Sequence, residues 1–223
     1  MSVTVQREGS VAVLNWDDNE NRVNVDTLAE LNGALDEAQS IEGPLSLVVA
    51  GVGKYFCNGM DLNRFAARSP EFATTMDALN LTIARLMVFP GYTVAAINGH
   101  AFAAGAMLSC GFDYRVMRED RGYWCLNEAE IGIAINDRAF STVSHRMPFA
   151  TATDAVLTAR RYTGPEALAA SIIEATALEG DVLAHALDVA ERASRLDRAT
   201  LTAHKRMING DQARRLGLDV PAR

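Results

Sequence analysis

The stretch Asn98-Gly99-His100-Ala101-Phe102-Ala103-Ala104-Gly105 stands between two apolar segments, Thr93–Ile97 and Ala106–Cys110. The first segment predicts a strand that is buried on both faces, and the second predicts a short buried helix. Small residues between them let the backbone approach a ligand closely. The amide groups at the start of a helix also favour a negative charge. In α/β proteins ligands bind beyond the carboxyl ends of strands, so this loop predicts a ligand site.

A second loop of the same kind follows another apolar run, Leu45–Ala50. Its sequence is Lys54-Tyr55-Phe56-Cys57-Asn58-Gly59-Met60-Asp61-Leu62. Two backbone N–H groups that converge on one carbonyl oxygen would stabilise an enolate or a tetrahedral oxyanion, each by about 3 kcal/mol. Taken singly, either loop is more often a close-packing turn without a ligand, and that alternative stays open at this point.

The rest of the chain predicts an α/β domain with a helical tail. Strands and helices mix over residues 1–147, and residues 148–223 form a helical region of the same domain, without a predicted strand after Glu128. Asp26, Ser69, Thr163 and Asp181 are the predicted helix caps. The predicted strands are Val3–Arg7, Val11–Trp16, Leu45–Ala50, Thr93–Ile97, Tyr114–Arg118 and Gly122–Cys125, and a last helix is predicted over Arg198–Ile208.

Composition excludes several classes of function. The net charge of −7 disfavours binding to a nucleic-acid backbone. The three cysteines, Cys57, Cys110 and Cys125, have no CxxC spacing, and no pair of histidines has metal-ligand spacing, so neither a disulfide framework nor a metal is predicted. No apolar run reaches the roughly 18 residues of a membrane helix, and no signal peptide is evident, so we expect a cytoplasmic protein.

The two loops together resemble the paired oxyanion-hole loops of the crotonase (enoyl-CoA hydratase/isomerase) superfamily. The matching phrases are Phe56–Leu62 and Ala95–Gly105, at the family's separation. Asn21–Asn24 resembles the first CoA-contacting turn of the family, and Tyr162–Leu168 with Ile172–Ala175 resembles its C-terminal segment. The resemblance covers nearly the whole chain. It implies a crotonase-like spiral of β-β-α turns with a helical C-terminal trimerisation region, and an assembly of trimers or hexamers.

The resemblance also implies an acyl-CoA thioester as ligand, with coenzyme A as part of the substrate and no separate cofactor. The oxyanion donors would be the backbone N–H groups of Met60 and Ala104. The CoA and acyl pocket would be lined by Arg22, Val23, Asn58, Gly59, Met60, Asp61, Leu62, Ala104 and Met107.

The number of carboxylates distinguishes the reactions of this family. A hydratase of the family uses two glutamates, and the first stands three residues after the second oxyanion donor, where this chain has Met107. The second matches Glu128, by its spacing before Gly132. One remaining carboxylate resembles the Δ3,Δ2-enoyl-CoA isomerases. Glu128 would remove a proton from C2 of a 3-enoyl thioester and return it at C4, while apolar Met107 raises its pKa and excludes water.

Other interpretations stay open. Glu128 could be a surface carboxylate beside Glu130, and the chain could be a non-catalytic acyl-CoA-binding protein, a hydratase or another enolate-forming crotonase. Ala104 stands where the family usually has glycine, and Ile133–Asp137 lacks the proline and glycines common in hydratases. We expect Asp61 to orient its loop, Asp137 to be a reserve acid, and His100, Tyr123 and Trp124 to pack. Lys205 and Arg206 belong to a solvated helix face or reach CoA phosphates.

Overall fold

The computed structural model describes residues 2–66 and 69–221, so the outermost ends of the two predicted regions, at residues 1 and 222–223, lie outside the described residues. Its larger sheet has six strands in the order β1-β2-β3-β5-β7-β9. β1 and β2, both predicted as strands, form an antiparallel hairpin, and the other pairings are parallel. The strands are β1 (Val3–Glu8), β2 (Val11–Trp16), β3 (Ser46–Gly51), β5 (Tyr92–Ile97), β7 (Tyr114–Arg118) and β9 (Ala175–Ala177).

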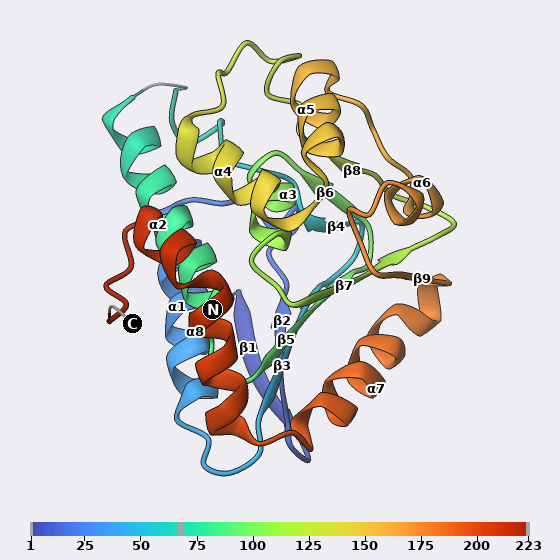
Figure 1. The fold of residues 1–223 in the computed structure, drawn as a ribbon. Coiled ribbons are helices and arrows are strands. Elements are labelled where there is room, and N and C mark those ends of the chain that lie inside the picture. Colours follow the sequence, from blue (N-terminus) through green and yellow to red (C-terminus); the bar gives the residue numbers. More distant parts are fainter. Residues whose placement is uncertain (1, 67–68, 222–223) are drawn as a thin grey trace.

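A smaller parallel sheet lies beyond the carboxyl ends of the central strands. It contains β4 (Tyr55–Cys57), β6 (His100–Phe102) and β8 (Trp124–Cys125). β3, β5 and β7 are each followed by a short strand and then by a helix, and the hairpin β1–β2 is followed by α1, which gives the expected spiral of β-β-α turns (Figure 1). β4 and β6 lie inside the stretches that the sequence predicts as loops. That prediction was wrong there, because three residues are too few to show a period of two.

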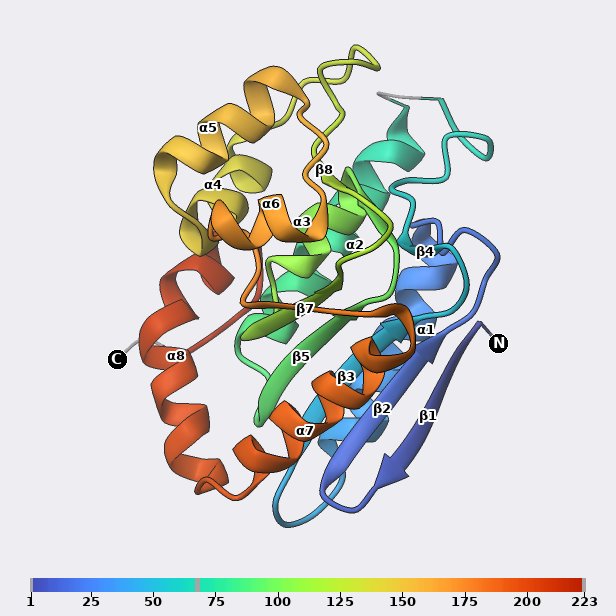
Figure 2. The same cartoon turned by 90° about the vertical axis from the view of Figure 1, so that its right-hand side faces the viewer.

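Helices cover both faces of the large sheet. On one face α7 packs against β3, β5 and β7, and Figure 2 shows it crossing in front of these strands. On the other side α1, α2 and α8 lie together (Figure 1). The helices are α1 (Val25–Gln39), α2 (Pro70–Met87), α3 (Ala104–Ser109), α4 (Asp137–Arg146), α5 (Phe149–Thr158), α6 (Gly164–Ala169), α7 (Val182–Ser194) and α8 (Arg198–Arg215), with a 3₁₀ turn at Glu179–Asp181.

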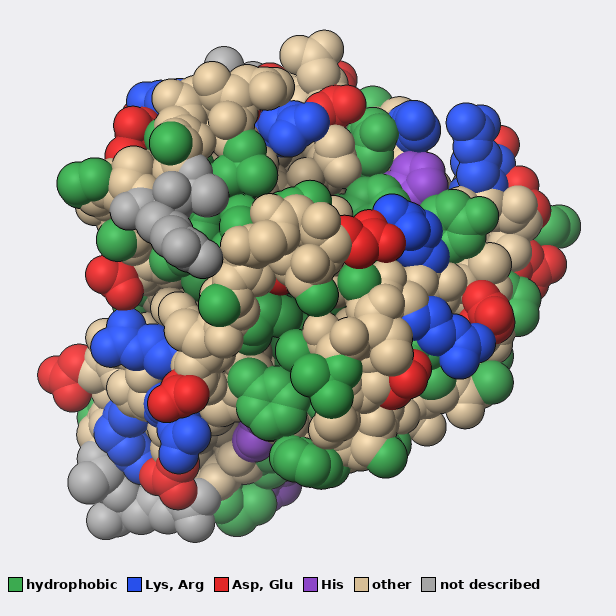
Figure 3. Space-filling model, turned by 90° about the horizontal axis from the view of Figure 1, so that it is seen from above, with side chains coloured by type: hydrophobic (Ala, Val, Ile, Leu, Met, Phe, Trp, Pro, Cys, Tyr) green, Lys and Arg blue, Asp and Glu red, His purple; other side chains and the backbone are tan. Residues whose placement is uncertain are grey.

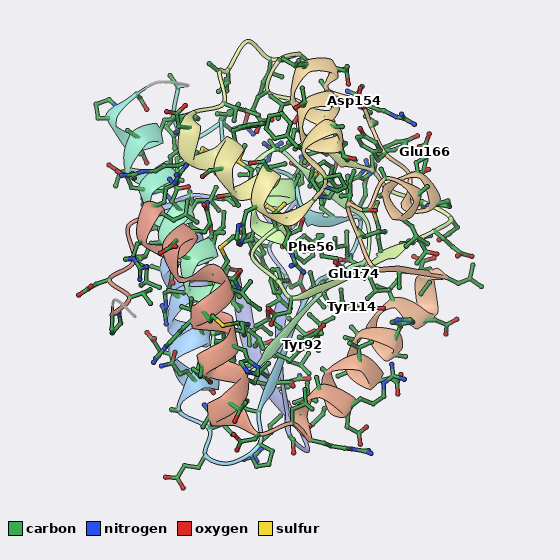
Figure 4. All side chains as sticks on the ribbon, viewed as in Figure 1. Phe56, Tyr92, Tyr114, Asp154, Glu166 and Glu174 are labelled. Atoms are coloured by element: carbon green, nitrogen blue, oxygen red, sulfur yellow. The ribbon has the colours of Figure 1, made fainter. Side chains whose placement is uncertain are left out.

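The first helix begins earlier than predicted. Its N-cap is Asn24, whose side chain accepts hydrogen bonds from the backbone of Asp26 and Thr27, and Thr27 completes a capping box. Asp26 is therefore in the first turn, where its charge still favours the helix dipole. The predicted caps Ser69 and Thr163 are confirmed, and Glu166 completes the capping box of Thr163 (Figure 4). Asp181 holds the N-cap position of α7 without a side-chain bond.

The tail is not purely helical. The prediction of no strand after Glu128 was wrong, because β9 adds a sixth strand beside β7. Glu174, just before β9, accepts hydrogen bonds from the backbone N–H and the buried guanidinium of Arg115 (Figure 4). The strand was missed because it is short and alanine-rich, and tertiary pairing rather than propensity determines it.

The last helix is anchored by a buried charge. Lys205 is 3% exposed and pairs with Asp113, and it also donates to the carbonyls of Leu86 and Gly91. The expectation of a solvated Lys205 was therefore wrong, whereas Arg206 is exposed. α8 extends to Arg215, beyond the predicted end at Ile208, and it packs along α2.

Candidate active site

The smaller sheet brings the two glycine-bearing loops together. β4 and β6 pair in parallel, so the loops that follow them leave the sheet on the same side. A side chain at Gly59, where φ is 77°, would lie 3.2 Å from the Ala103 side chain and 3.9 Å from the Ala104 nitrogen. A side chain at Gly105 would lie 2.4 Å from the carbonyl oxygen of Cys57. Both glycines are therefore needed for the close approach of the loops.

The two predicted oxyanion donors are unused within the protein. Among the described residues, no hydrogen bond engages the backbone N–H of Met60 or of Ala104. Met60 lies between two bonds of a short bridge, because Val23 donates to the Gly59 carbonyl and Asp61 donates to the Val23 carbonyl. Ala104 begins α3, and the turn that precedes it has a positive φ of 49° at Ala103. Free amides at a fixed position are what an oxyanion hole requires.

A polar cluster holds the first of these loops. The carboxylate of Glu20 accepts from Arg22 and from the amide of Asn58, at 2.6 Å and 3.1 Å. The hydrogen bond from Asn58 is the largest cause that lowers the pKa of Glu20. Arg22 also approaches the Met60 carbonyl oxygen at 3.4 Å. The predicted CoA-contacting turn and the loop are thus connected, and Glu20 is a member that sequence reasoning missed.

A narrow cavity opens beside the two free amides. Its volume is about 60 Å³. It lies between α2, α3, the start of α4 and the segment that follows β8. Its lining is Met60, Leu62, Phe72, Met76, Ala103, Ala104, Met107, Glu128, Ile131, Ile133, Ala134, Ile135, Asn136 and Ala139. The face seen from above carries hydrophobic side chains among charged ones (Figure 3).

Glu128 is the one carboxylate in this lining. Its side chain is buried, and its Oε2 has no hydrogen-bond partner among the described residues. Burial raises the pKa of Glu128 to about 7, and its own backbone N–H opposes this only in part. A carboxyl with such a pKa can both take up and release a proton near neutral pH. The interpretation of Glu128 as a surface carboxylate was wrong, because only its neighbour Glu130 is exposed, where it pairs with Arg161.

The other candidate acids and the histidine lie outside the lining. Asp137 is exposed in the first turn of α4, and Asp61 is half-buried beside the Met60 loop. His100 packs among aromatic rings, with its ring stacked on Phe102 at 5.1 Å, as expected. Trp124 is buried and donates to Ser109, so its predicted role in packing is confirmed. Phe56, at the centre of Figure 4, is likewise a core residue.

The predicted site residues fall into two groups. Met60, Leu62, Ala104, Met107 and Glu128 line the cavity together. The others lie next to the cavity, on the connected turn and loop: Arg22, Val23, Asn58, Gly59 and Asp61. Val23 is fully buried there.

The cavity lining also has residues that were not predicted as parts of the site. Ile131, Ile133–Asn136 and Ala139 follow Glu128, in a segment without regular structure and at the start of α4. Their signal in the sequence is weak, because the segment after Glu128 has no pattern that predicts a regular element.

The described residues include neither a candidate metal site nor a helix that could span a membrane. Within residues 2–66 and 69–221, no group of three or more His, Cys, Asp or Glu residues could hold a metal ion. Over the same residues, no helix has the length and hydrophobicity to cross a membrane.

Comparison with known proteins agrees with this geometry. Residues 6–217 match the family "Enoyl-CoA hydratase/isomerase", and the chain belongs to that family. Enoyl-CoA delta isomerase 3 of Arabidopsis thaliana is 31% identical over 182 residues, which is 78% of this chain and 76% of the relative. Its peroxisomal enoyl-CoA delta isomerase 2 is 29% identical over 80% of this chain and 78% of the relative.

The solved structures include a probable enoyl-CoA hydratase from Mycobacterium tuberculosis H37Rv. It superposes with a TM-score of 0.91 at 28% identity, over 97% of this chain and 92% of that one. Relatives named as hydratases and as isomerases share this fold, so the fold does not determine the reaction.

Proposed function

We propose that this protein is an enoyl-CoA isomerase that converts a 3-enoyl-CoA to the 2-enoyl-CoA, with Glu128 as the only acid and base. The observation that carries the proposal is a single buried carboxylate in an apolar cavity beside two free backbone amides. The names of the Arabidopsis relatives support it.

The mechanism needs one proton carrier and one anion site. The thioester carbonyl oxygen accepts hydrogen bonds from Met60 N–H and Ala104 N–H. Glu128 removes a proton from C2, and the electron pair moves into a dienolate whose negative charge rests on that oxygen. The Glu128 carboxyl then returns the proton at C4, and the double bond between C2 and C3 forms. Substrate and product have the same atoms, so no co-reactant is needed.

Met107 explains why isomerisation is favoured over hydration. Hydration needs a second group that activates water, and Met107 has no exchangeable proton. Its side chain is 4% exposed and lines the cavity. An apolar group at this position lowers the local polarity, which keeps the pKa of Glu128 high and excludes water from the reactive dienolate.

The first test is product analysis with a 3-enoyl-CoA in deuterated water. We expect the 2-enoyl isomer with little deuterium at C4, because Glu128 returns the proton that it removed. For Glu128→Gln we expect a loss of about 10³-fold in kcat, as typical for removing a general base. Glu130→Gln is the matched control, because Glu130 is exposed and should change kcat by less than about twofold.

The other outcomes are equally informative. A product heavier by one water would replace the proposal with a hydratase, and Asp61 and Asp137 would be the next acids to test. Binding of the thioester without any turnover would replace it with an acyl-CoA-binding protein.

A further inference from the structure

The size of the cavity next to Glu128 bears on the length of the acyl chain that it can enclose. Its volume is about 60 Å³. A water molecule needs at least about 10–15 Å³ measured in this way, so the cavity holds roughly four to six water-sized groups. A methylene group is of similar size, and the same number of carbons therefore fits.

The walls of the cavity come from three helices. Met107 on α3 and Ala139 on α4 are buried in the core, at 4% and 2% exposure. Phe72 on α2 is held edge-on against Phe65, with ring centroids 6.3 Å apart. Met76, one turn further along α2, is half-buried and lines the cavity without a comparable aromatic partner. It is the long, flexible member of the wall.

One contact joins α2 and α4 at this point, and a second fixes the start of α4. Asp77 accepts from Arg138 at 3.1 Å, and these residues are direct neighbours of Met76 and Ala139 in the sequence. The Asn136 side chain accepts from the Ala139 N–H at 2.9 Å and so fixes the first turn of α4. Met76 and Ala139 therefore line the cavity next to the residues that join the two helices.

The lining is also poor in polar groups. Glu128 and Asn136 are the two residues with polar side chains in the described lining, and the Asn136 oxygen is occupied as a helix cap. Away from Glu128 and Asn136, a hydroxyl or a charge on the acyl chain would lose its hydration among apolar side chains. The lining thus fits a plain hydrocarbon chain.

We propose that this enzyme takes short, unsubstituted acyl chains of about four to six carbons, and that Met76 is the residue that limits their length. This inference rests on the proposed function, and it adds the substrate class. Replacing Met76 with alanine removes three non-hydrogen atoms from the wall and opens space for about three more carbons.

The test is a chain-length profile of kcat/KM for 3-butenoyl-, 3-hexenoyl-, 3-octenoyl- and 3-decenoyl-CoA. For the wild type we expect a fall of about tenfold or more from hexenoyl to decenoyl, because carbons that do not fit within the lining displace the thioester from its reactive position. Met76→Ala should raise the ratio of decenoyl to hexenoyl by about tenfold. Ala139→Val should act in the opposite direction and lower the ratio of hexenoyl to butenoyl.

Two control variants distinguish the effect of side-chain volume at position 76 from a general loss of stability or activity. Met76→Leu keeps nearly the same volume and should keep the wild-type profile. Leu81→Ala, at an exposed position of α2 outside the lining, should do the same. A wild type that prefers decenoyl over hexenoyl, or a Met76→Ala profile equal to that of Leu81→Ala, would overturn the proposal.

Binding distinguishes this proposal from the proposed function. Butanoyl-, hexanoyl- and decanoyl-CoA cannot isomerise, and their affinities can be measured by calorimetry. If no 3-enoyl-CoA turns over but decanoyl-CoA gains affinity in Met76→Ala, the isomerase proposal fails and the length limit stands. If every chain length is isomerised and bound equally well, the isomerase stands and the length limit fails.

Discussion

At the scale of the residue, the chemistry depends on how one carboxylate is buried. Desolvation is the largest cause of the raised pKa of Glu128, and no charged neighbour is among its causes. The site thus tunes its acid by apolar surroundings, as catalytic carboxyls with a pKa near neutrality often are tuned. Sequence reasoning could identify the residue by its spacing before Gly132, but burial depends on Ile131–Ala139, whose path no local pattern revealed.

The pH dependence of turnover should report this residue. Glu128 must be ionised to remove the proton, so kcat/KM should rise with pH and level off above an apparent pKa of about 7. The measurement is kcat/KM for a 3-enoyl-CoA between about pH 5 and pH 9, with Glu130→Gln in parallel. An acid limb near the ordinary value of 4.5 would show that Glu128 is solvated or is not the base.

The same residue should make stability depend on pH. Its folded pKa, about 7, lies above the ordinary 4.5, so between these values the folded protein keeps a proton that the unfolded chain releases. Stability therefore falls as pH rises through this window, by about 3 kcal/mol in total.

Glu128→Gln has no proton to lose and should escape this fall. Near pH 4.5 its melting temperature should be close to that of the wild type, and near pH 8 it should be higher by up to about 10 °C. Differential scanning calorimetry at both pH values measures the two differences. A difference between variant and wild type that does not change with pH would contradict the assignment.

At the scale of the element, the short strands position the site. β4 and β6 have three residues each, yet their pairing holds the Gly59 and Gly105 loops in contact. The long strands could be predicted from apolar runs. The short ones could not, since they exist only where two loops meet. The cap at Asn24 was missed for a similar reason, because Asp26 is an equally good local candidate and only the path of the turn decides.

Adding a methyl group between the two loops should lower kcat more than it lowers the stability of the fold. In Gly105→Ala the new methyl group would lie 2.4 Å from the Cys57 carbonyl oxygen, so α3 or β4 must shift and the Ala104 N–H moves with it. We expect kcat to fall by about 10²-fold or more, the typical loss for one oxyanion donor, with a smaller change in KM.

Gly33→Ala is the matched control for that change. Its position in α1 has no neighbour within 4 Å of the new methyl group, and alanine favours a helix by about 1 kcal/mol. Kinetics and thermal melts of both variants decide the point. Equal turnover in the two would mean that the loops tolerate separation and that Ala104 does not act as a donor.

At the scale of the whole molecule, the nearly complete likeness of the chain to one family made the architecture predictable. The spiral was implied by the resemblance of the two loops to that family, and the two apolar runs predicted the strands that precede the loops. The tail was the weak part, because β9 and the buried Lys205 depend on long-range contacts with β7 and Asp113. A lysine on a helix usually indicates a solvent-exposed position, and the buried partner of Lys205 is evident only in the folded structure.

Oligomerisation is the prediction that belongs to this scale. The tail exposes large hydrophobic side chains: Phe149 at 68% and Leu157 at 74% on α5, and Met207 at 51% and Ile208 at 61% on α8. Exposed apolar groups of this size mark contact surfaces. We therefore expect a mass of about three times 24.1 kDa, or twice that for a dimer of trimers, in light scattering coupled to size-exclusion chromatography. The double variant Phe149→Glu, Leu157→Glu should dissociate the assembly. Its circular dichroism spectrum should stay unchanged, because both side chains are exposed and point away from the core.

A wild-type mass near 24.1 kDa at micromolar concentration would refute this expectation and leave the exposed side chains without an assigned partner.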